Sequence, residues 1–137
     1  MRRKWSLRPE MLDGSVPPEV FARVSDFSPL IDAGECVERA AIATTPLTLL
    51  VMTDRYLHTV TARGTHEWAD GAPRSSLTAR AEGEDLVVLV ADEERRFGSV
   101  LPAGAAGRFA DELYKPFTVE DARQAQGRVA SIADVAW

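Results

Sequence analysis

The sequence predicts a mainly β domain of the α+β class, in which seven antiparallel strands form a barrel or sandwich capped by a helix. Two observations support this prediction. Seven short segments rich in apolar and β-branched residues are separated by turn signals, as in an antiparallel meander. A longer segment with an apolar stripe at helical spacing follows the last of them. One further helix is predicted before the strands and another at the C-terminus.

Length and composition indicate one globular domain. The chain has 137 residues, of which 45% are hydrophobic, and a domain of this size buries roughly two-thirds of its unfolded surface. The single Cys36 cannot form an internal disulfide, which fits a reducing compartment. No apolar run approaches the ~20 residues of a membrane-spanning helix. We therefore expect a cytoplasmic protein, and its abundance of Arg and Ala is typical of GC-rich bacterial genomes.

The lead-in helix is predicted over residues 17–27. Pro17 and Pro18 suit a first helical turn, apolar residues follow at spacings of three and four, and Pro29 ends the helix. Residues 1–14 are expected to form a tail whose Trp5 and Leu7 dock on the domain. The domain itself is assigned to residues 15–116.

The hairpin over residues 47–62 organises the predicted strands. An apolar strand, 47–52, meets a polar corner, 53–55, and a second strand over 56–62 is rich in β-branched and aromatic residues. Residues 70–73, with the sequence Asp-Gly-Ala-Pro, are predicted to be a loop. The remaining strands are predicted over 36–43, 65–69, 75–81, 86–90 and 96–100.

Two helices are predicted to close the chain. The capping helix, 103–115, carries an apolar stripe made of Ala106, Phe109, Ala110 and Leu113, and Pro116 ends it. The extension over 117–137 repeats apolar or small residues at alternating spacings of three and four. Two heptads of small residues are too weak to hold a coiled-coil dimer alone. We expect a helix that lies along the domain or contacts a partner.

No catalytic site, metal site or cofactor site is predicted. His58 and His66 lie on neighbouring strands without further ligands at zinc-site spacing, so His58 is interpreted as a strand residue with a satisfied ring. The sequence contains no nucleophile elbow, dinucleotide fingerprint or P-loop. Two acidic clusters are predicted to lie on solvated hairpin tips. They consist of Glu82, Glu84, Asp85, Asp92, Glu93 and Glu94.

The formal net charge of −5 disfavours nucleic acid as a partner, because sequence-independent binding needs a concentrated basic face. Basic residues gather around one aromatic residue only near the N-terminus. This segment is the candidate contact for a membrane surface or an anionic ligand. Its residues are Arg2, Arg3, Lys4, Trp5 and Arg8.

The order of the predicted elements resembles the pleckstrin-homology-like (PH-like) superfold, and two stretches are similar to its bacterial YokE-like domains. Residues 30–35 run from Leu to Gly-Glu, and residues 49–57 join an apolar strand to a Thr-Asp-Arg corner. The resemblance covers about residues 28–115. Eukaryotic PH domains that bind phosphoinositides place Lys and Arg around the loop that joins the first two strands. Here that loop, residues 44–46, is Thr-Thr-Pro, so the resemblance implies a protein-binding scaffold.

We accordingly predict a non-enzymatic interaction module that binds a protein partner through a sheet edge, the groove beside the capping helix, or the C-terminal extension. Membrane or anionic-ligand binding through the N-terminal segment is one alternative, and a small enzyme of unknown chemistry is the other. Arg55, at the polar corner, is a candidate rim residue for a ligand. The candidate partner-binding residues of the extension are Val119, Ala122, Gln126, Val129 and Trp137.

Overall fold

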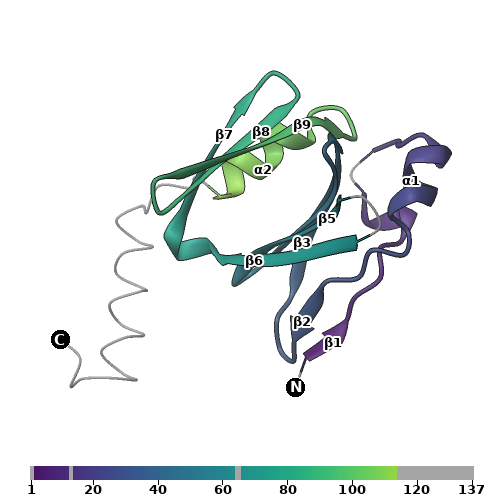
Figure 1. Ribbon diagram of the computed structural model, residues 1–137, viewed down its shortest axis with the longest axis horizontal. Coiled ribbons are helices and arrows are strands. Elements are labelled where there is room, and N and C mark those ends of the chain that lie inside the picture. The colour runs from purple at the N-terminus through teal and green to yellow at the C-terminus, as the bar shows by residue number, and fades with distance from the viewer. Residues whose placement is uncertain (1, 13, 64–65, 114–137) are drawn as a thin grey trace.

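The computed structural model describes residues 2–12, 14–63 and 66–113, with the backbone alone for residues 63 and 66–69, and it is mainly β (Figure 1). Seven antiparallel strands follow one another in the sheet order β6-β5-β4-β3-β9-β8-β7, and α2 (Ala105–Leu113) packs on the β7–β9 part. The predicted class, mainly β with a C-terminal helix, is confirmed. The strands are β3 (Val37–Thr45), β4 (Leu47–Thr53), β5 (Tyr56–Arg63), β6 (His66–Pro73), β7 (Leu77–Glu82), β8 (Asp85–Val90) and β9 (Glu93–Leu101).

The seven strands form two meanders that pack face to face. One meander comprises β3 to β6 and the other β7 to β9 (Figure 1). Among the described strands, a short pairing of β3 with β9 joins their ladders, at Ile42↔Leu101, Ala43↔Val100 and Thr45↔Gly98. Because this junction is short, the second meander can fold over the first and enclose an apolar interior with α2.

The interior cluster is the larger of two apolar clusters. It combines Leu50 and Met52 of β4, Leu86 of β8 and Phe109 of α2, all at most 1% exposed. The predicted stripe of α2 is buried against it, as helical spacing requires.

The second apolar cluster lies on the opposite face of the β3–β5 meander, beneath the N-terminal segment. Leu7, Val24 and Ile31 of that segment cover Leu49 and Val51 of β4. Successive residues of a strand point to opposite faces, so β4 is buried on both sides. This explains why residues 47–52 are apolar without alternation.

The N-terminal segment is an ordered layer of the domain rather than the expected tail. β1 (Arg2–Lys4) pairs with β2 (Leu30–Asp32), and η1 (Pro9–Met11) and α1 (Pro18–Val24) lie between them in the chain. The Trp5 N–H donates to the Pro29 carbonyl over 3.0 Å. The predicted docking of Trp5 and Leu7 on the domain agrees with this layer, in which Leu7 is 6% exposed.

Two predicted boundaries are wrong because edge pairing extends the strands. The predicted loop 70–73 belongs to β6, where Pro73 stands opposite Tyr56. Among the described strands β6 is an edge, and an edge tolerates Pro and Gly because one side needs no ladder bonds. β9 begins at Glu93 rather than residue 96, since its charged residues pair with β8 up to Val90.

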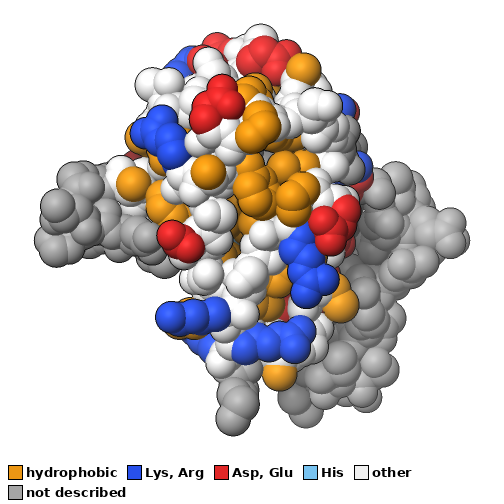
Figure 2. All heavy atoms as spheres, turned by 90° about the vertical axis from the view of Figure 1, so that its right-hand side faces the viewer, with side chains coloured by type: hydrophobic (Ala, Val, Ile, Leu, Met, Phe, Trp, Pro, Cys, Tyr) orange, Lys and Arg blue, Asp and Glu red, His pale blue; other side chains and the backbone are white. Residues whose placement is uncertain are grey.

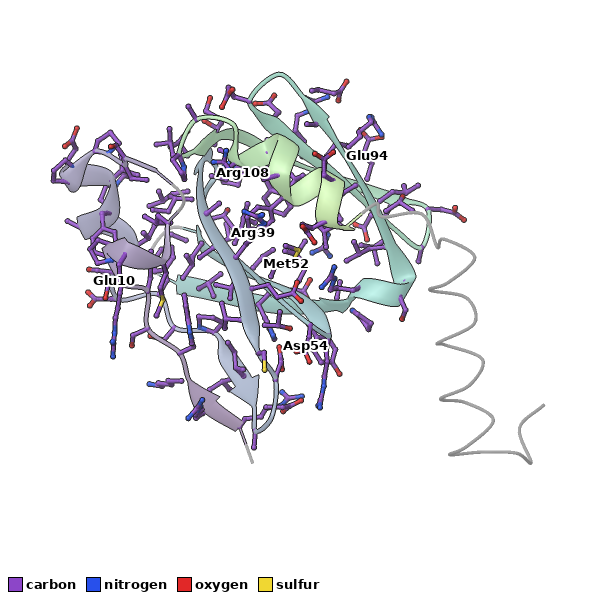
Figure 3. All side chains as sticks on the ribbon, turned by 180° about the vertical axis from the view of Figure 1, so that it is seen from behind. Glu10, Arg39, Met52, Asp54, Glu94 and Arg108 are labelled. Carbon is purple, nitrogen blue, oxygen red and sulfur yellow. The ribbon has the colours of Figure 1, made fainter. Side chains whose placement is uncertain are left out.

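Arg74 fastens the C-terminal end of α2 to the first meander. It lies in η2 (Arg74–Ser76), and its Nη2 donates to the Glu112 carbonyl over 3.1 Å. Its Nη1 donates to Glu38 Oε2 at 2.8 Å and to the Thr53 carbonyl at 3.0 Å. The last turn of α2 contains no basic residue, so Arg74 satisfies a helix-end carbonyl from outside the helix. Arg39 of β3, labelled in Figure 3, also reaches this end of α2, where its Nη2 lies 4.0 Å from Glu112 Oε1.

Ion pairs cover the outer face of the second meander. Arg80 of β7 and Glu94 of β9 reach across β8 with an Nη2–Oε1 distance of 3.2 Å, and Arg96 and Glu82 form a second crossing. Val87 of β8 pairs in register with both arginines and is 1% exposed. The carboxylates expected on solvated tips are thus exposed but partly ion-paired.

Candidate functional site

A pocket of about 270 Å³ opens where the β1–β2 ladder meets β5 and β6. Concave sites with a few convergent polar groups are the preferred places for ligands. The pocket is lined by Arg2, Pro29, Leu30, Asp32, Tyr56, His58, Asp70 and Gly71. A second hollow, of about 290 Å³, lies on the outer face of β7 and β8, and Arg80 is the one charged residue in its lining.

Strand alternation places the pocket residues. Tyr56, His58 and Val60 share one face of β5, while Leu57 and Thr59 point to the other. Val60 belongs to the apolar cluster under the N-terminal segment. His58 lies nearer the start of β5, where the covering layer ends, and stands opposite Gly71 of β6.

A buried carboxylate holds the His58 ring. Glu35 Oε2 lies 2.6 Å from His58 Nε2, and Glu35 Oε1 accepts the Asp32 N–H over 3.1 Å. Burial alone would raise the pKa of Glu35, but hydrogen bonds from Thr53, His58 and the Asp32 N–H outweigh it and lower that pKa from the usual 4.5. Glu35 is therefore a carboxylate at neutral pH, and a carboxylate can only accept. His58 Nε2 consequently carries a proton, and in the neutral form of the ring Nδ1 is then an acceptor.

Gly71 leaves space in front of that acceptor. A Cβ atom on Gly71 would stand 3.3 Å from Nδ1 and 3.6 Å from Cε1 of His58. Any side chain at position 71 would therefore crowd the Nδ1 edge of the ring. Both residues line the pocket, so the glycine keeps the ring accessible from it.

The other walls are aromatic and acidic. The Tyr56 ring is tilted by 48° to the His58 ring, with 5.6 Å between centroids. Asp70 accepts its neighbour's Gly71 N–H at 2.8 Å and Arg95 Nη1 at 2.6 Å, and the Arg95 bond lowers the pKa of Asp70 despite partial burial. Asp32 Oδ1 accepts Arg2 Nε at 3.0 Å. Polar groups that accept hydrogen bonds thus outnumber the single cation in the lining.

The structure distributes the predicted basic residues unevenly. Arg2 reaches the pocket through its bond to Asp32, whereas Arg3 and Lys4 are exposed on β1 and Arg8 is exposed before η1. Trp5 is half-buried against the apolar cluster beneath the N-terminal segment. The predicted partner-binding residues of the extension lie outside the described residues. They are Val119, Ala122, Gln126, Val129 and Trp137.

Arg55 does not line the pocket. It is exposed, and its Nη2 lies 3.9 Å from where a Cβ on Gly34 would stand. The corner around it forms as its residues predict: Thr53 Oγ1 accepts the N–H groups of Arg55 and Tyr56 at 3.1 and 2.9 Å. Asp54, labelled in Figure 3, instead accepts the Cys36 N–H at 2.8 Å, so it ties the start of β3 to this corner.

Four residues in or directly behind the pocket are not predicted as site residues from the sequence: Glu35, Tyr56, Asp70 and Gly71. Glu35 and His58 are 23 positions apart, and no local pattern joins them. The available signal was Gly71, because a glycine within a strand marks a close approach of another group.

The chemistry of the site is that of an acceptor pocket. Within the described residues, no group of three or more His, Cys, Asp or Glu side chains is placed to hold a metal ion. In the same part of the chain, no helix is long and apolar enough to cross a membrane.

No family model matches the chain, and neither a curated protein nor a solved structure matches it.

Proposed function

We propose that the protein is a non-enzymatic, PH-like interaction module that binds a protein partner at the pocket beside His58. The observation that carries this proposal is a histidine acceptor, fixed by Glu35, in a pocket whose rim includes Leu30, a large hydrophobic side chain that is 49% exposed. Protein interfaces combine apolar contacts with about one hydrogen bond per 100–200 Å², and this pocket offers groups for both.

The strand order supports the PH-like part of the proposal. A four-stranded meander is followed by a three-stranded one, and the first strand of the former pairs with the last strand of the latter. A helix then packs on the second meander. This order agrees with the PH-like barrel that the sequence resembles from about residue 28 to 115.

Pocket size supports a protein partner. At about 270 Å³ the pocket is smaller than the roughly 300–1,000 Å³ of sites that enclose drug-sized molecules. It is large enough for one side chain of a partner, whose neighbouring residues would lie over Leu30 and Tyr56.

The surroundings of His58 support binding over catalysis. A histidine–carboxylate pair supplies the base of a nucleophilic site but needs an adjacent hydroxyl or thiol. The described contacts of the ring with Glu35, Tyr56 and Gly71 include no serine, threonine or cysteine side chain. The thiol of Cys36 instead faces the Gly34 carbonyl at 3.9 Å. That thiol is exposed and single, which supports a reducing, cytoplasmic location.

Membrane or anion binding through the N-terminal segment is a second candidate. Arg3 and Lys4 are exposed, and Lys4 pairs in register with the exposed Leu30. On this side of the molecule, Figure 2 shows hydrophobic side chains gathered over the middle and Lys and Arg side chains on the lower part. Sedimentation with anionic vesicles tests it: binding that weakens with salt would support it, and no binding at low salt would reject it.

The proposed function is tested by affinity capture from the native host with three baits. These are the wild-type chain, Gly71→Ala, and Gly107→Ala as the matched control, since a Cβ on Gly107 meets no atom within 4 Å. We expect a partner that wild-type and Gly107→Ala recover equally and that Gly71→Ala recovers at least about tenfold less. Equal recovery of every captured protein by all three baits would contradict the function.

A further inference from the structure

The hydrogen-bonding groups in the pocket are complementary to a donor. In the neutral ring with its proton on Nε2, His58 Nδ1 offers a lone pair, and the Asp32 carboxylate offers a further acceptor site beyond its bond to Arg2. Arg2 is the single cation in the lining, and Asp32 already engages its Nε. The ionised Glu35 stands directly behind His58 and adds negative charge.

The shape of the site favours a planar cation. Tyr56 gives an aromatic wall beside His58, and cations are attracted to the faces of such rings. A guanidinium group is flat, stacks on aromatic rings and presents several N–H donors in a fixed fork. An ammonium group is a compact point charge that cannot stack in this way. A carboxylate or phosphate would face the Asp32 carboxylate and would find one lining cation, Arg2, that is already paired with it.

Resting on the proposed function, we propose that the pocket receives an arginine side chain of the partner protein. The guanidinium stacks beside Tyr56, donates to His58 Nδ1 and to the Asp32 carboxylate, and lies in the space that Gly71 leaves open. Glu35 acts as a positioning residue, because its bond to Nε2 fixes the ring with Nδ1 toward the pocket.

Gly71 offers a steric test that changes no charge. Its backbone φ lies outside the left-handed region, so alanine suits the β6 backbone. The added methyl group would stand 3.3 Å from Nδ1, where the guanidinium donor has to approach. Gly71→Ala should therefore fold as the wild type does while losing the site.

The test is a titration of the ¹⁵N-labelled full chain, followed by NMR, with N-acetyl-arginine methylamide. The probes for comparison are the corresponding lysine derivative and the citrulline derivative, a neutral isostere of arginine. We expect saturable shifts at Tyr56, His58, Asp70 and Gly71 with the arginine derivative. Binding of the citrulline derivative should be at least about tenfold weaker, as charge-assisted hydrogen bonds predict. Gly71→Ala should reduce arginine binding by a similar factor, and Gly107→Ala should not change it.

The comparison of the arginine, lysine and citrulline derivatives remains informative even if Gly71→Ala does not fold, because all three are titrated into the wild-type protein. Equal binding of arginine and citrulline derivatives, or no saturable shift with either, would overturn the inference. Tighter binding of the lysine derivative would also overturn it, since it would indicate a point charge rather than a planar group.

A competition experiment separates this inference from the proposed function. If the captured partner depends on Gly71 but the arginine derivative does not displace it, the arginine inference fails and the interaction module stands. If Gly71→Ala captures the same proteins as the wild type while the arginine derivative binds at the pocket, the proposed function fails. The preference of the pocket for a guanidinium group is then retained.

Discussion

The two faces of the β3–β5 meander are covered in different ways. One face is closed by the second meander and α2, which form the interior cluster. The other is covered by the N-terminal layer, whose longest element is the seven-residue α1. Both coverings bury their side of β4 completely, yet they differ further along, where β5 meets β6.

That difference leaves one narrow hollow and one larger pocket. On the interior face, the hollow lined by Leu57, Thr59 and Phe97 measures about 20 Å³, little more than the space of one water molecule. Arg95 of β9 and Asp70 of β6 pair beside it. On the other face the pocket measures about 270 Å³. The proposed binding site lies where the thinner layer stops short of the edge strand.

Truncating neighbouring leucines of β4 should give the largest effects. Leu50 faces the interior cluster and Leu49 faces the N-terminal layer, and both are 0% exposed. Each leucine-to-alanine change should lower the free energy of unfolding by about 2–5 kcal/mol. Leu50→Ala should cost more, because short N-terminal elements can move into a cavity more readily than two meanders and a helix. Denaturant unfolding measures the free energy of unfolding of both variants. A larger loss for Leu49→Ala than for Leu50→Ala would contradict the expected order of the two faces.

Arg74→Ala should have the second-largest effect on stability. It affects only the closed side, that is, the face of the β3–β5 meander covered by the second meander and α2. The change removes bonds to Glu38, Thr53 and the Glu112 carbonyl at the end of α2. We expect a loss of about 1–3 kcal/mol in unfolding free energy, with faster hydrogen exchange in α2. Arg23, exposed on α1, is the matched control, and its change to alanine should be nearly neutral. An effect of Arg74→Ala no larger than the control would disprove the proposed capping.

Glu35→Gln tests the open side, that is, the face covered by the N-terminal layer, through the pH dependence of stability. The folded-state pKa of Glu35 lies below its ordinary value of 4.5, so the carboxylate stabilises the fold above that pH. This contribution is lost as the pH falls through the folded-state pKa. At neutral pH we expect Glu35→Gln to be less stable by about 1–2 kcal/mol, and the two proteins should converge in acid. Unfolding curves that stay a constant distance apart between pH 7 and pH 3 would contradict the role of the buried charge.

Arg2→Gln should have the smallest effect on stability but a measurable one on binding. Its ion pair with Asp32 lies at the surface, with the Arg2 side chain 67% exposed, so unfolding should change by less than about 0.5 kcal/mol. Removing the single cation of the lining should strengthen binding of the arginine derivative roughly two- to fivefold at low salt. Weaker binding would mean that Arg2 contacts the ligand favourably, which suits an anion.

The elements that cover the closed side are easier to predict from the sequence than the elements that cover the open side. α2 is buried on one face and its apolar residues recur at the helical period, while β8 is a short run of five apolar residues, so local patterns predicted both. The run of Leu47 to Met52 was recognised as a strand, but its reason, burial on both faces, depends on the N-terminal layer. The helix of that layer and the docking of Trp5 and Leu7 are predicted, but its strands are not, because they are three residues long and β1 consists of charged residues only.

The pocket could not be predicted because its residues come together through tertiary packing. The prediction that His58 has a satisfied ring agrees with the structure, but its partner Glu35 comes from the connection before β3. The Asp-Gly-Ala-Pro stretch was interpreted as a loop on local propensity. Pairing with β5 overrides that propensity and turns Asp70 and Gly71 into pocket walls.

The ¹⁵N spectrum of the His58 ring, recorded at neutral pH with and without N-acetyl-arginine methylamide, tests the central claim most directly. The account predicts a protonated Nε2 and an unprotonated Nδ1, with the Nδ1 signal alone shifting strongly as the arginine derivative donates to it. A proton on Nδ1 in the free protein, or an Nδ1 signal that does not respond to the derivative, would contradict an open acceptor pocket.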